Sequence, residues 1–347
     1  MEKAQEIWNI KSSEFPYDGD LEHQIEFILR YAILAPSTHN SQPWLFDVEG
    51  GSCKIYSNPS VNIYYADIKG RDLHISIGCC IENLITAAKW FGIYNDVQYY
   101  CGRNDNLLAE VQFQSRSSTH KPAEIDELLF RALTKRRNHR RKYLDKDVNM
   151  KQVDELRSLN SFQDIEVDFV TDKGVIHEVG ELTKKGVQTA YRNPEFRKEM
   201  STWMHSSFSK KRDGLLGYSL GVPALLSVIL PTTVRFLNIG KKIGNLCKNV
   251  IQSAPMVCIL SANDDHCKTW LKVGRLAQRY LLLLDERGLQ TSVYVASIEI
   301  GDHHKELQEL LGLDTIPQFL FTLGYMDGDQ PYSPRHSVTE KIVSIEE

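Results

Sequence analysis

Residues 35–44 read Ala-Pro-Ser-Thr-His-Asn-Ser-Gln-Pro-Trp. Two prolines, Pro36 and Pro43, enclose a run of hydrogen-bonding side chains between a predicted helix at 20–34 and a predicted strand at 45–49. Because a proline ring fixes a backbone angle, such a loop is stiff, and its polar groups are in place before a ligand arrives. A helix stop followed by Asx-type hydrogen bonds explains the same residue types. Taken alone, the loop favours this second explanation.

The composition is that of a globular protein with room for a large core. The chain has 347 residues, of which 42% are hydrophobic and 25% charged, and its formal net charge is -4. This length predicts two domains or one large one. The slightly acidic balance gives no general reason to expect nucleic-acid binding. Residues 1–20 are polar and mixed in charge, so we expect no signal peptide.

The cysteines favour free thiols over a structural framework. There are seven of them, and no C-x-x-C pair occurs. An odd number without that spacing argues against a disulfide framework and against a structural zinc site. Reduced thiols are typical of the cytosol, so we expect a cytoplasmic protein without a metal site.

The stretch 214–234 contains no charged residue. Its length would suffice to span a bilayer. However, it contains three glycines, two prolines and several hydroxyl side chains, which favour a folded-over segment. We therefore expect no membrane partner.

Two parts of the chain follow the same plan. A helix with apolar residues at helical spacing begins near residue 77, ends at a glycine and leads to a strand at 97–101, and a second such helix near 276 leads to a strand at 293–296. Four residue pairs share one offset along the chain: Gly78 and Gly274, Gly92 and Gly288, Ile93 and Leu289, Val97 and Val293. A repeat of this length indicates duplication and fusion. Chance similarity between two amphipathic helices is the alternative.

Duplication predicts two halves, at 1–120 and 121–347. The second half also contains a segment at about 188–253 that has no counterpart in the first. Long insertions in enzymes are often lids that close over a site. We therefore expect a lid-like insertion in the second half.

Two further segments carry charge in a suggestive pattern. Residues 136–143 read Arg-Arg-Asn-His-Arg-Arg-Lys-Tyr, and arginine forks match phosphate oxygens. A solvated helix end or a nucleic-acid patch would show a similar run. Residues 334–336 read Pro-Arg-His, which alone fits a surface tail.

A G-x-S-x-G motif occurs at 217–221 and suggests a serine hydrolase. The nucleophile elbow of that class requires a strand before the serine and a helix after it. Only Leu215 and Leu216 precede the motif in a strand-like pattern, so a serine hydrolase is disfavoured.

Together, the proline loop, the arginine segment and the tail resemble the nitroreductase superfamily, most closely its Acg-like branch. That branch shows an A-P-S-x-x-N-x-Q-P-W loop, an R-x-x-N/H-R-R-x-F/Y segment, a late Gly-Tyr strand end (here Gly324 and Tyr325) and a following P-R-R. The resemblance covers about residues 21–343 and is weakest across the insertion. This chain differs in having His336 where a second arginine is common.

The resemblance implies an α+β fold of mixed sheets wrapped by helices, here a pseudo-twofold fusion of two nitroreductase-like halves. It also implies that flavin mononucleotide (FMN) carries the chemistry. By resemblance, the cofactor-binding residues are Arg140, Arg141 and Arg335 at the phosphate, Ser37 and Asn40 at the edge of the ring, Pro36 and Gln42 along that wall, and Thr291 and Ser292 near N5 of the flavin.

The family further implies an oxidoreductase that passes electrons from NAD(P)H through FMN to a small acceptor such as a quinone or a nitroaromatic. The chain has no G-x-G-x-x-G fingerprint, so NAD(P)H is expected as a transient donor. An FMN storage or sequestration protein with little turnover is the alternative. One fused chain would act as a monomer or a homodimer.

The motifs predict a single complete site. In the family, one subunit supplies the arginine segment and the other the proline loop. Here the first half keeps the loop but lacks the arginine segment, and the second half keeps the segment but has only residues 160–163 where the loop should be.

We therefore expect about one FMN per polypeptide, because only one pair of half-sites is complete after duplication. Fluorescence of flavin released from a known amount of protein measures this ratio. Two flavins per chain would contradict the single composite site, and no flavin after reconstitution would contradict the family resemblance as a guide to function.

Overall fold

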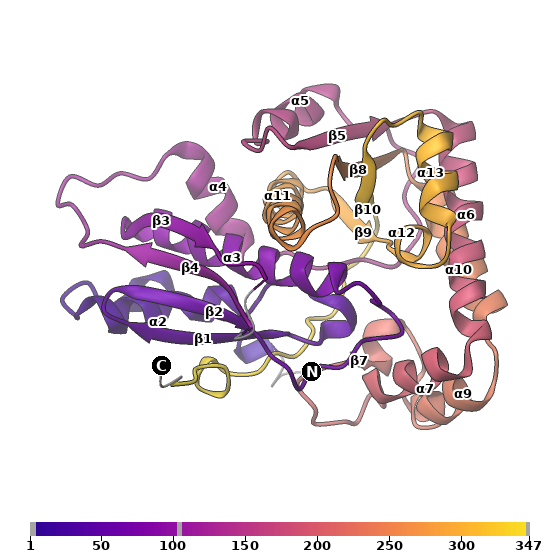
Figure 1. Cartoon of the computed structure of the whole chain (residues 1–347), viewed down its shortest axis with the longest axis horizontal. Helices are drawn as coiled ribbons and strands as arrows, with labels where there is room; N and C mark the ends of the chain where they lie inside the picture. Colours follow the sequence, from indigo (N-terminus) through magenta and orange to yellow (C-terminus); the bar gives the residue numbers. More distant parts are fainter. Residues whose placement is uncertain (1–4, 103–105, 345–347) are drawn as a thin grey trace.

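The computed structural model describes residues 5–102 and 106–344, and in these ranges two four-stranded sheets lie on either side of two long helices (Figure 1). The first sheet has the order β1 (Trp44–Glu49), β2 (Ser52–Ser57), β4 (Leu107–Phe113) and β3 (Tyr94–Tyr99). The second has the order β5 (Ile165–Val170), β8 (Met256–Ala262), β10 (Ile316–Gly324) and β9 (Gln290–Val293). Neighbouring strands within each sheet are antiparallel. The predicted α+β class is confirmed.

The two sheets have the same topology. In each, a long helix follows the second strand of the spatial order and leads to the edge strand at the far side: α3 (Arg71–Phe91) connects β2 to β3, and α11 (Cys267–Glu286) connects β8 to β9. The predicted repeat therefore includes the whole strand order of each sheet as well as the two long helices. The division of the chain at residue 120 stays a prediction.

The long helices cross at equivalent glycines. A Cβ atom added to Gly78 would overlap the backbone oxygen of Leu271, and one added to Gly274 would overlap the backbone oxygen of Ile75. Ile75 and Leu271 are separated along the chain by the same offset as the two glycines. The contact is thus reciprocal, and it requires glycine at both positions because the backbones touch.

At the outer edge of each four-stranded sheet, a segment outside the named strands pairs with the edge strand in parallel orientation. The C-terminal tail adds to β1, where the Phe46 N–H donates to the Lys341 oxygen at 2.8 Å and the Val343 N–H donates to the Phe46 oxygen at 2.8 Å. The arginine segment forms a second parallel bridge, between Asn138 and Thr291 of β9. Segments distant in sequence thereby complete both sheets.

A large insertion replaces a hairpin turn in the second half. Gly50 and Gly51 join β1 to β2, whereas the equivalent strands β5 and β8 are joined by residues 171–255. The unmatched segment thus begins upstream of the expected residue 188. Its elements are α6 (Lys173–Arg192), α7 (Pro194–Trp203), β6 (Met204–His205), β7 (Leu215–Leu216), η3 (Gly217–Leu220), α8 (Ala224–Ser227), α9 (Leu230–Phe236) and α10 (Gly240–Ser253).

The remaining elements cover the sheets and the helix pair. They are η1 (Ser12–Glu14), α2 (Leu21–Ala32), η2 (Thr38–Asn40), α4 (Glu124–Ala132), α5 (Met150–Ser158), α12 (Ala296–Glu299), α13 (His303–Leu311) and η4 (Val338–Glu340). The predicted strand at 293–296 is wrong, because β9 ends at Val293 and Ala296 begins α12. Across the described residues, no helix is both long and apolar enough to cross a membrane.

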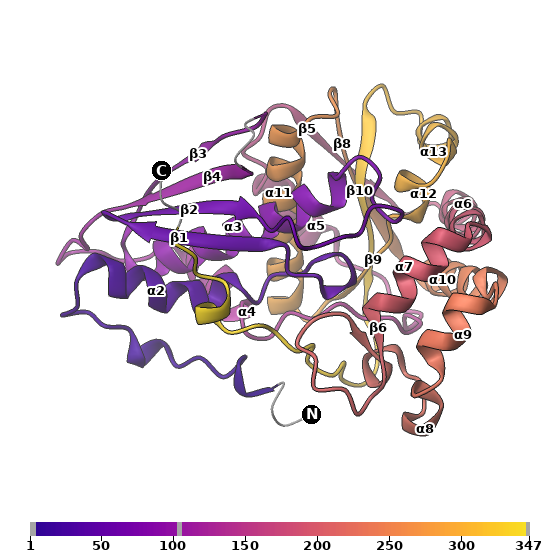
Figure 2. The ribbon, with the colours of Figure 1, turned by 60° about the horizontal axis from the view of Figure 1, so that its bottom comes forward.

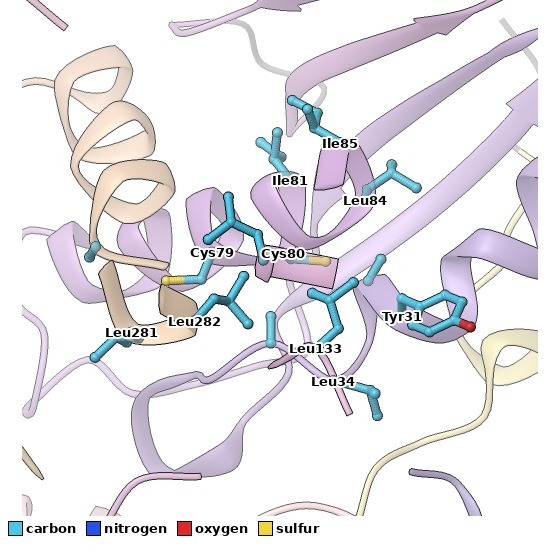
Figure 3. Close-up of a cluster of buried hydrophobic side chains, with 14 of the residues drawn as sticks. Tyr31, Leu34, Cys79, Cys80, Ile81, Leu84, Ile85, Leu133, Leu281 and Leu282 are labelled. Atoms are coloured by element: carbon cyan, nitrogen blue, oxygen red, sulfur yellow. The ribbon is translucent and has the colours of Figure 1, made fainter. Parts of the chain in front are cut away.

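The core lies where α3 meets α11 (Figure 3). Cys79 of α3 points toward Leu281 and Leu282 of α11, whereas the sulfur of Cys80 points to the opposite side of α3, and Leu133 at the end of α4 belongs to the same core. All five side chains are buried. Burial raises the pKa of both thiols, so these cysteines act as packing residues.

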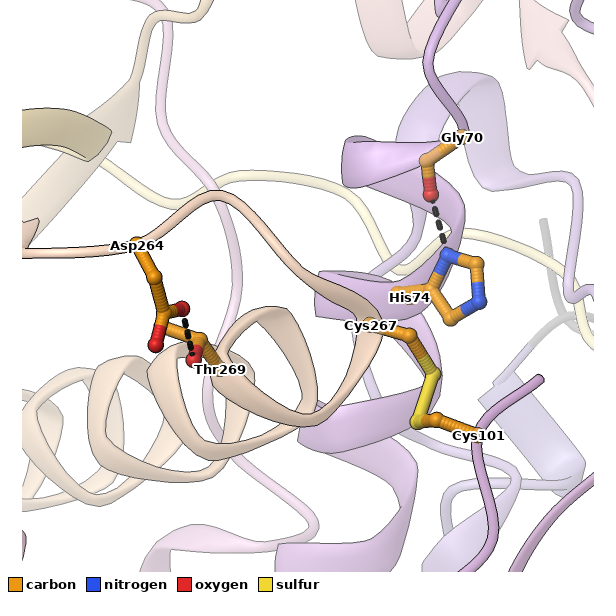
Figure 4. Close-up of a disulfide and its surroundings, with 6 residues drawn as sticks. All are labelled: Gly70, His74, Cys101, Asp264, Cys267 and Thr269. Atoms are coloured by element: carbon orange, nitrogen blue, oxygen red, sulfur yellow. Dashed lines mark hydrogen bonds between the residues drawn. A yellow bond between two sulfur atoms is a disulfide. The ribbon is translucent and has the colours of Figure 1, made fainter.

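The expectation that the cysteines form no disulfide is wrong for one pair. Cys101, just after β3, is bonded to Cys267, the first residue of α11, with a Cα–Cα distance of 5.9 Å (Figure 4). The bond ties the first sheet to the second long helix. Cysteine counting could not find it, because 166 residues separate the pair and only the fold brings them together.

A buried ion network crosses the same helix pair. The Glu82 side chain is 3% exposed and accepts hydrogen bonds from Arg275 Nε at 2.7 Å and Arg279 Nε at 2.5 Å. Burial by itself would raise the pKa of Glu82, but the charges of Arg279 and Arg275 outweigh it and lower the pKa to about 2. The carboxylate is therefore ionised and paired at neutral pH.

Replacing Glu82→Gln should lower the free energy of unfolding by about 3–5 kcal/mol at pH 7, because it leaves two buried arginines without their counter-ion. The folded-state pKa lies below the ordinary value of 4.5, so this stabilisation is present above pH 4.5 and is lost as the pH falls toward 2. Urea unfolding at several pH values measures both effects.

The exposed pair of Glu195 and Lys198 offers a matched control. Glu195→Gln should change the free energy of unfolding by less than about 1 kcal/mol. Equal losses for the two variants, or a loss that does not shrink in acid, would contradict the assigned role of Glu82.

Candidate functional site

The proline loop has an unusual backbone. His39, Asn40 and Gln42 have φ angles of 53°, 56° and 51°, all in the left-handed region that non-glycine residues rarely adopt. Such residues cost roughly 1–3 kcal/mol each and persist only where their surroundings fix them. Left-handed residues of this kind are concentrated at binding and catalytic sites.

The predicted loop residues fix this conformation through their own side chains. Ser37 Oγ accepts from the Gln42 N–H at 2.9 Å. The Gln42 amide donates to the Arg212 oxygen at 2.7 Å and accepts from the His336 N–H at 2.9 Å. The Asn40 amide donates to the Pro334 oxygen at 3.1 Å. Their role at a flavin ring stays a prediction, but their present partners show that they shape the loop.

Arg335 is a buried residue that holds the loop in place through hydrogen bonds. Its side chain is 5% exposed and donates to Asn40 Oδ1 at 2.7 Å and to the backbone oxygens of Leu34 and Ala35 at 3.1 Å. Burial, and then the charge of Arg136, lower the pKa of Arg335 to about 9. The residue thus joins the end of α2 to the loop, and it has no carboxylate partner within residues 5–102 and 106–344.

The arginine segment runs along the free edge of β9. The His139 N–H donates to the Thr291 oxygen at 2.9 Å, Ser292 Oγ donates to the His139 oxygen at 2.6 Å, and the Val293 N–H donates to Asn138 Oδ1 at 3.1 Å. Thr291 and Ser292 are buried. They therefore position the segment, whatever contact they make with a ligand.

The arginines of this segment have different partners. Arg137 donates to the Gln330 oxygen at 2.7 Å, and Arg141 donates to the backbone oxygens of Asp327 and Asp329. Arg140 is exposed and, among the residues that the structure describes, has no hydrogen bond or ion pair from its side chain. Of the adjacent pair predicted at the phosphate, Arg140 is thus the one whose guanidinium is free.

Arg136 is the second cation without a counter-ion. It is 4% exposed, and in the described part of the chain its side chain forms no hydrogen bond or ion pair. Burial lowers its pKa, and the carboxylate of Asp285 is close enough to oppose that effect. Two buried arginines, Arg136 and Arg335, therefore influence each other's charge without a carboxylate bonded to either.

The loop and the arginine segment come together at His39 and Arg140. Burial, and then the charge of Arg140, lower the pKa of His39 to about 4. The same arginine acts on Tyr191 and Cys247 of the insertion and on Tyr294. Residues from three parts of the chain thus lie close enough to the free guanidinium of Arg140 to be affected by its charge.

Several buried nitrogen atoms in these segments lack partners. His39 Nε2, His139 Nδ1 and Arg335 Nε have no hydrogen bond in the described structure. Unpaired donors together with two uncompensated guanidinium groups fit an anion, because burying such groups without a partner is costly. This donor set is compatible with a phosphate. His39, Arg136 and His139 were not predicted as site residues, although all three stand in the quoted motifs.

The insertion lies against the loop. The Gly214 N–H donates to the Asn40 oxygen at 3.3 Å, Arg212 pairs with Glu340 at 2.5 Å, and Asp213 lies 4.0 Å from His336. A lid-like role stays a prediction, and residues 206–214 are the part of the insertion placed to serve it. Gly214 and Gly217 are close-packed, because a Cβ atom added to Gly214 would overlap His205 and one added to Gly217 would overlap Ser227.

The G-x-S-x-G motif lacks the geometry of a nucleophile elbow. Ser219 lies in the short 3-10 turn η3, and its hydroxyl donates to the Leu216 oxygen at 2.7 Å. The strand before it, β7, has two residues. The hydrolase reading is therefore not supported.

Two cavities lie away from the loop. One of about 540 Å³ is lined by residues 143–148 and 252–256 among others, and one of about 360 Å³ is lined by residues of β5 together with Arg157 and Tyr280. The second lies beside Asn160, where the second half lacks a proline loop. Neither brings together the residues predicted at the flavin.

The fold is that of an α+β protein, and two relatives that match over most of their length narrow the class. Two Mycobacterium tuberculosis (strain H37Rv) proteins are similar: "Putative NAD(P)H nitroreductase acg", 22% identical over 324 residues, covering 91% of this chain and 94% of its own length, and "Putative NAD(P)H nitroreductase Rv3131", 23% identical over 334 residues, covering 93% and 92%. No family model matches the chain. The motifs and these relatives together show that the chain is similar to proteins of the nitroreductase superfamily.

Similarity to solved structures is weaker. The FMN and NADPH-dependent nitroreductase NfnB of sphigopyxis sp. strain HMH is 18% identical and covers 63% of this chain and 99% of its own, with a TM-score of 0.42. Iodotyrosine deiodinase bound to FMN and 3-iodo-L-tyrosine is 18% identical and covers 60% and 95%, with a TM-score of 0.39. Scores this low do not decide the arrangement of the halves.

Replacing Arg140→Ala should weaken FMN binding by roughly tenfold to a hundredfold or more, the loss of a charge-assisted contact of about 1.5–3 kcal/mol. Riboflavin, which lacks the phosphate, should bind almost unchanged. Flavin fluorescence titration of the apoprotein with each ligand measures the difference.

Lys142→Ala is the matched control, because Lys142 is an exposed cation of the same segment and has no ion pair among the described residues. It should leave both affinities unchanged. Equal losses of FMN and riboflavin in Arg140→Ala would show that the arginine acts through the fold instead.

Proposed function

We propose that the chain is an FMN-dependent oxidoreductase of nitroreductase type that passes electrons from NAD(P)H to a small acceptor such as a quinone or a nitroaromatic. The observation that carries the proposal is the meeting of the left-handed proline loop and the free Arg140 around unpaired nitrogen donors. The names of the two mycobacterial relatives support the same activity.

The charged residues would hold the phosphate. The exposed Arg140 would reach it directly, and the buried Arg136 would add positive potential. An arginine is suited to this task because its planar fork matches two phosphate oxygens and stays charged when partly buried. Arg141 would act on the phosphate site indirectly, by holding residues 327–329 in place through hydrogen bonds.

The loop would form the wall beside the ring. Pro36 and Ser37 are half-buried and lie at its start, and Asn40 is fixed by Arg335. A rigid wall lowers the entropy lost on binding, since the loop is already ordered by its left-handed residues. FMN, when bound, supplies the hydride acceptance and electron release that no side chain provides.

The insertion would restrict the acceptor. Residues 206–214 lie on the loop through Gly214 and Arg212, and they would exclude water and bulky molecules from one side of the site. Small or planar acceptors fit this restriction. NAD(P)H would use the same opening in turn, which a ping-pong scheme requires.

The purified protein should show flavin absorbance, lose it on addition of NADH or NADPH without oxygen, and recover it when a quinone or nitroaromatic is added. Stopped-flow absorbance measures both half-reactions. No flavin after reconstitution would overturn the proposal, whereas bound FMN that is not reoxidised would favour storage or sequestration.

A double variant distinguishes a flavin that acceptors reach slowly from a flavin that does not react with acceptors at all. Arg212→Ala combined with Asp213→Ala removes the ion contacts of residues 206–214 with Glu340 and His336, so reoxidation and flavin release should both become a few-fold faster if this segment limits access. Lys210→Ala combined with Lys211→Ala is the control, since both lysines are exposed in the same segment and unpaired in the described structure. Equal rates in the two variants would remove the access role.

A further inference from the structure

The outer tip of the insertion exposes an unusual amount of apolar surface. In Figure 2, α8 and α9 lie at the lower right margin of the molecule, on the side away from the first sheet. The large hydrophobic side chains that are more than half exposed here are Leu225 (82%), Phe236 (70%), Leu226, Ile229 and Leu237 (58% each) and Val228 (55%). We define these six as the apolar tip. Four of these six side chains belong to residues 222–230 of the uncharged stretch.

The exposure is not a by-product of poor packing. The insertion has its own core, in which Val234 of α9 is fully buried against Tyr191, Phe196 and Met200. α9 thus satisfies its packing with one face and still presents Phe236 outward. Contiguous apolar surface of this kind on a folded protein marks an interaction site.

The stretch of sequence that contains the apolar tip carries charge of one sign. From Gly214 to Asn263 the sequence contains no aspartate or glutamate and four cations: Arg235, Lys241, Lys242 and Lys248. Lys248 pairs with Glu181, whereas Arg235, Lys241 and Lys242 are exposed and form no ion pair with any described residue. The whole chain has a net charge of -4, so this positive region is local.

A second basic element lies beside it. The Ser207 N–H donates to Ser227 Oγ of α8 at 2.8 Å, which joins the loop at 206–213 to the apolar tip. That loop exposes Phe208 (64%) together with Lys210 and Lys211. Aliphatic and phenyl side chains surrounded by unpaired lysine and arginine are the composition of surfaces that bind at an anionic bilayer.

We propose that the apolar tip inserts into the headgroup region of an anionic phospholipid membrane, with the neighbouring cations bound to lipid phosphates. A second copy of the chain is a poorer occupant, because a twofold contact through this surface would bring the exposed cations of both copies together. A protein partner would more often meet tyrosine and tryptophan, which the apolar tip lacks. The earlier expectation of no membrane partner rested on the absence of a span, which does not bear on surface binding. The proposal does not depend on the proposed reductase activity.

Co-sedimentation with phospholipid vesicles tests it. The full chain should pellet with vesicles of phosphatidylcholine and phosphatidylglycerol, should pellet far less with phosphatidylcholine alone, and should be released by high salt. Lys241→Gln combined with Lys242→Gln should weaken binding by about fivefold for each charge. Leu225→Ser combined with Leu226→Ser should weaken it by on the order of tenfold for each leucine.

Two controls keep the outcome interpretable. Ile68→Ser removes an exposed aliphatic side chain (62%) outside the insertion and should bind vesicles as the unmodified protein does. All three variants change exposed side chains, and circular dichroism confirms that each is folded. The same samples are measured by light scattering after gel filtration.

Failure to pellet, equal binding to neutral vesicles, or full binding by the leucine variant would overturn the proposal. A dimer without vesicles that becomes a monomer in the leucine variant would also overturn it, by assigning the apolar tip to a second copy.

Discussion

The close crossing of α3 and α11 is the constraint on which the rest of the structure depends. At Gly78 and Gly274 the two backbones touch, and one turn further along the Glu82 carboxylate is buried between Arg275 and Arg279. Apolar packing alone would tolerate several arrangements of two helices. Where two backbones touch, no side chain fits between them. A buried ion network is strongly destabilised when one of its charged partners is missing. The two together select one arrangement.

This crossing sets the distance between the parts of the site. The proline loop is tied to the start of α3, where the Thr38 N–H donates to Ser76 Oγ at 3.2 Å and the Thr38 hydroxyl donates to Asp72 at 3.3 Å. The arginine segment is tied to β9, which follows α11. A shift of one helix along the other would separate His39 from Arg140. A site built from two distant segments therefore depends on the rigid packing of α3 against α11, which sets the distance between the segments.

Features that depend on residues close together in the sequence, such as helix ends, could be predicted from the sequence. The helix ends at Gly92 and Gly288 are confirmed, because each glycine adopts the left-handed angle that terminates a helix. The motifs also identified the loop and the arginine segment. They could not distinguish Arg140 from Arg141, which are adjacent and chemically identical: only the tail carbonyls, brought near by the fold, occupy one and leave the other free. The disulfide escaped prediction for the same reason.

Several features that oppose folding lie in the parts that would bind something. Three left-handed residues in the loop and two buried arginines without counter-ions each cost free energy in the isolated chain. The exposed apolar tip of the insertion is unfavourable in water as well. The backbone contact at Gly78 and Gly274 and the Glu82 ion network contain no left-handed residue and no unpaired arginine. A rigid, duplicated centre thus permits local strain, unpaired charge and exposed hydrophobic surface at its margins, and those margins are where the binding energy of a ligand or a membrane would be released.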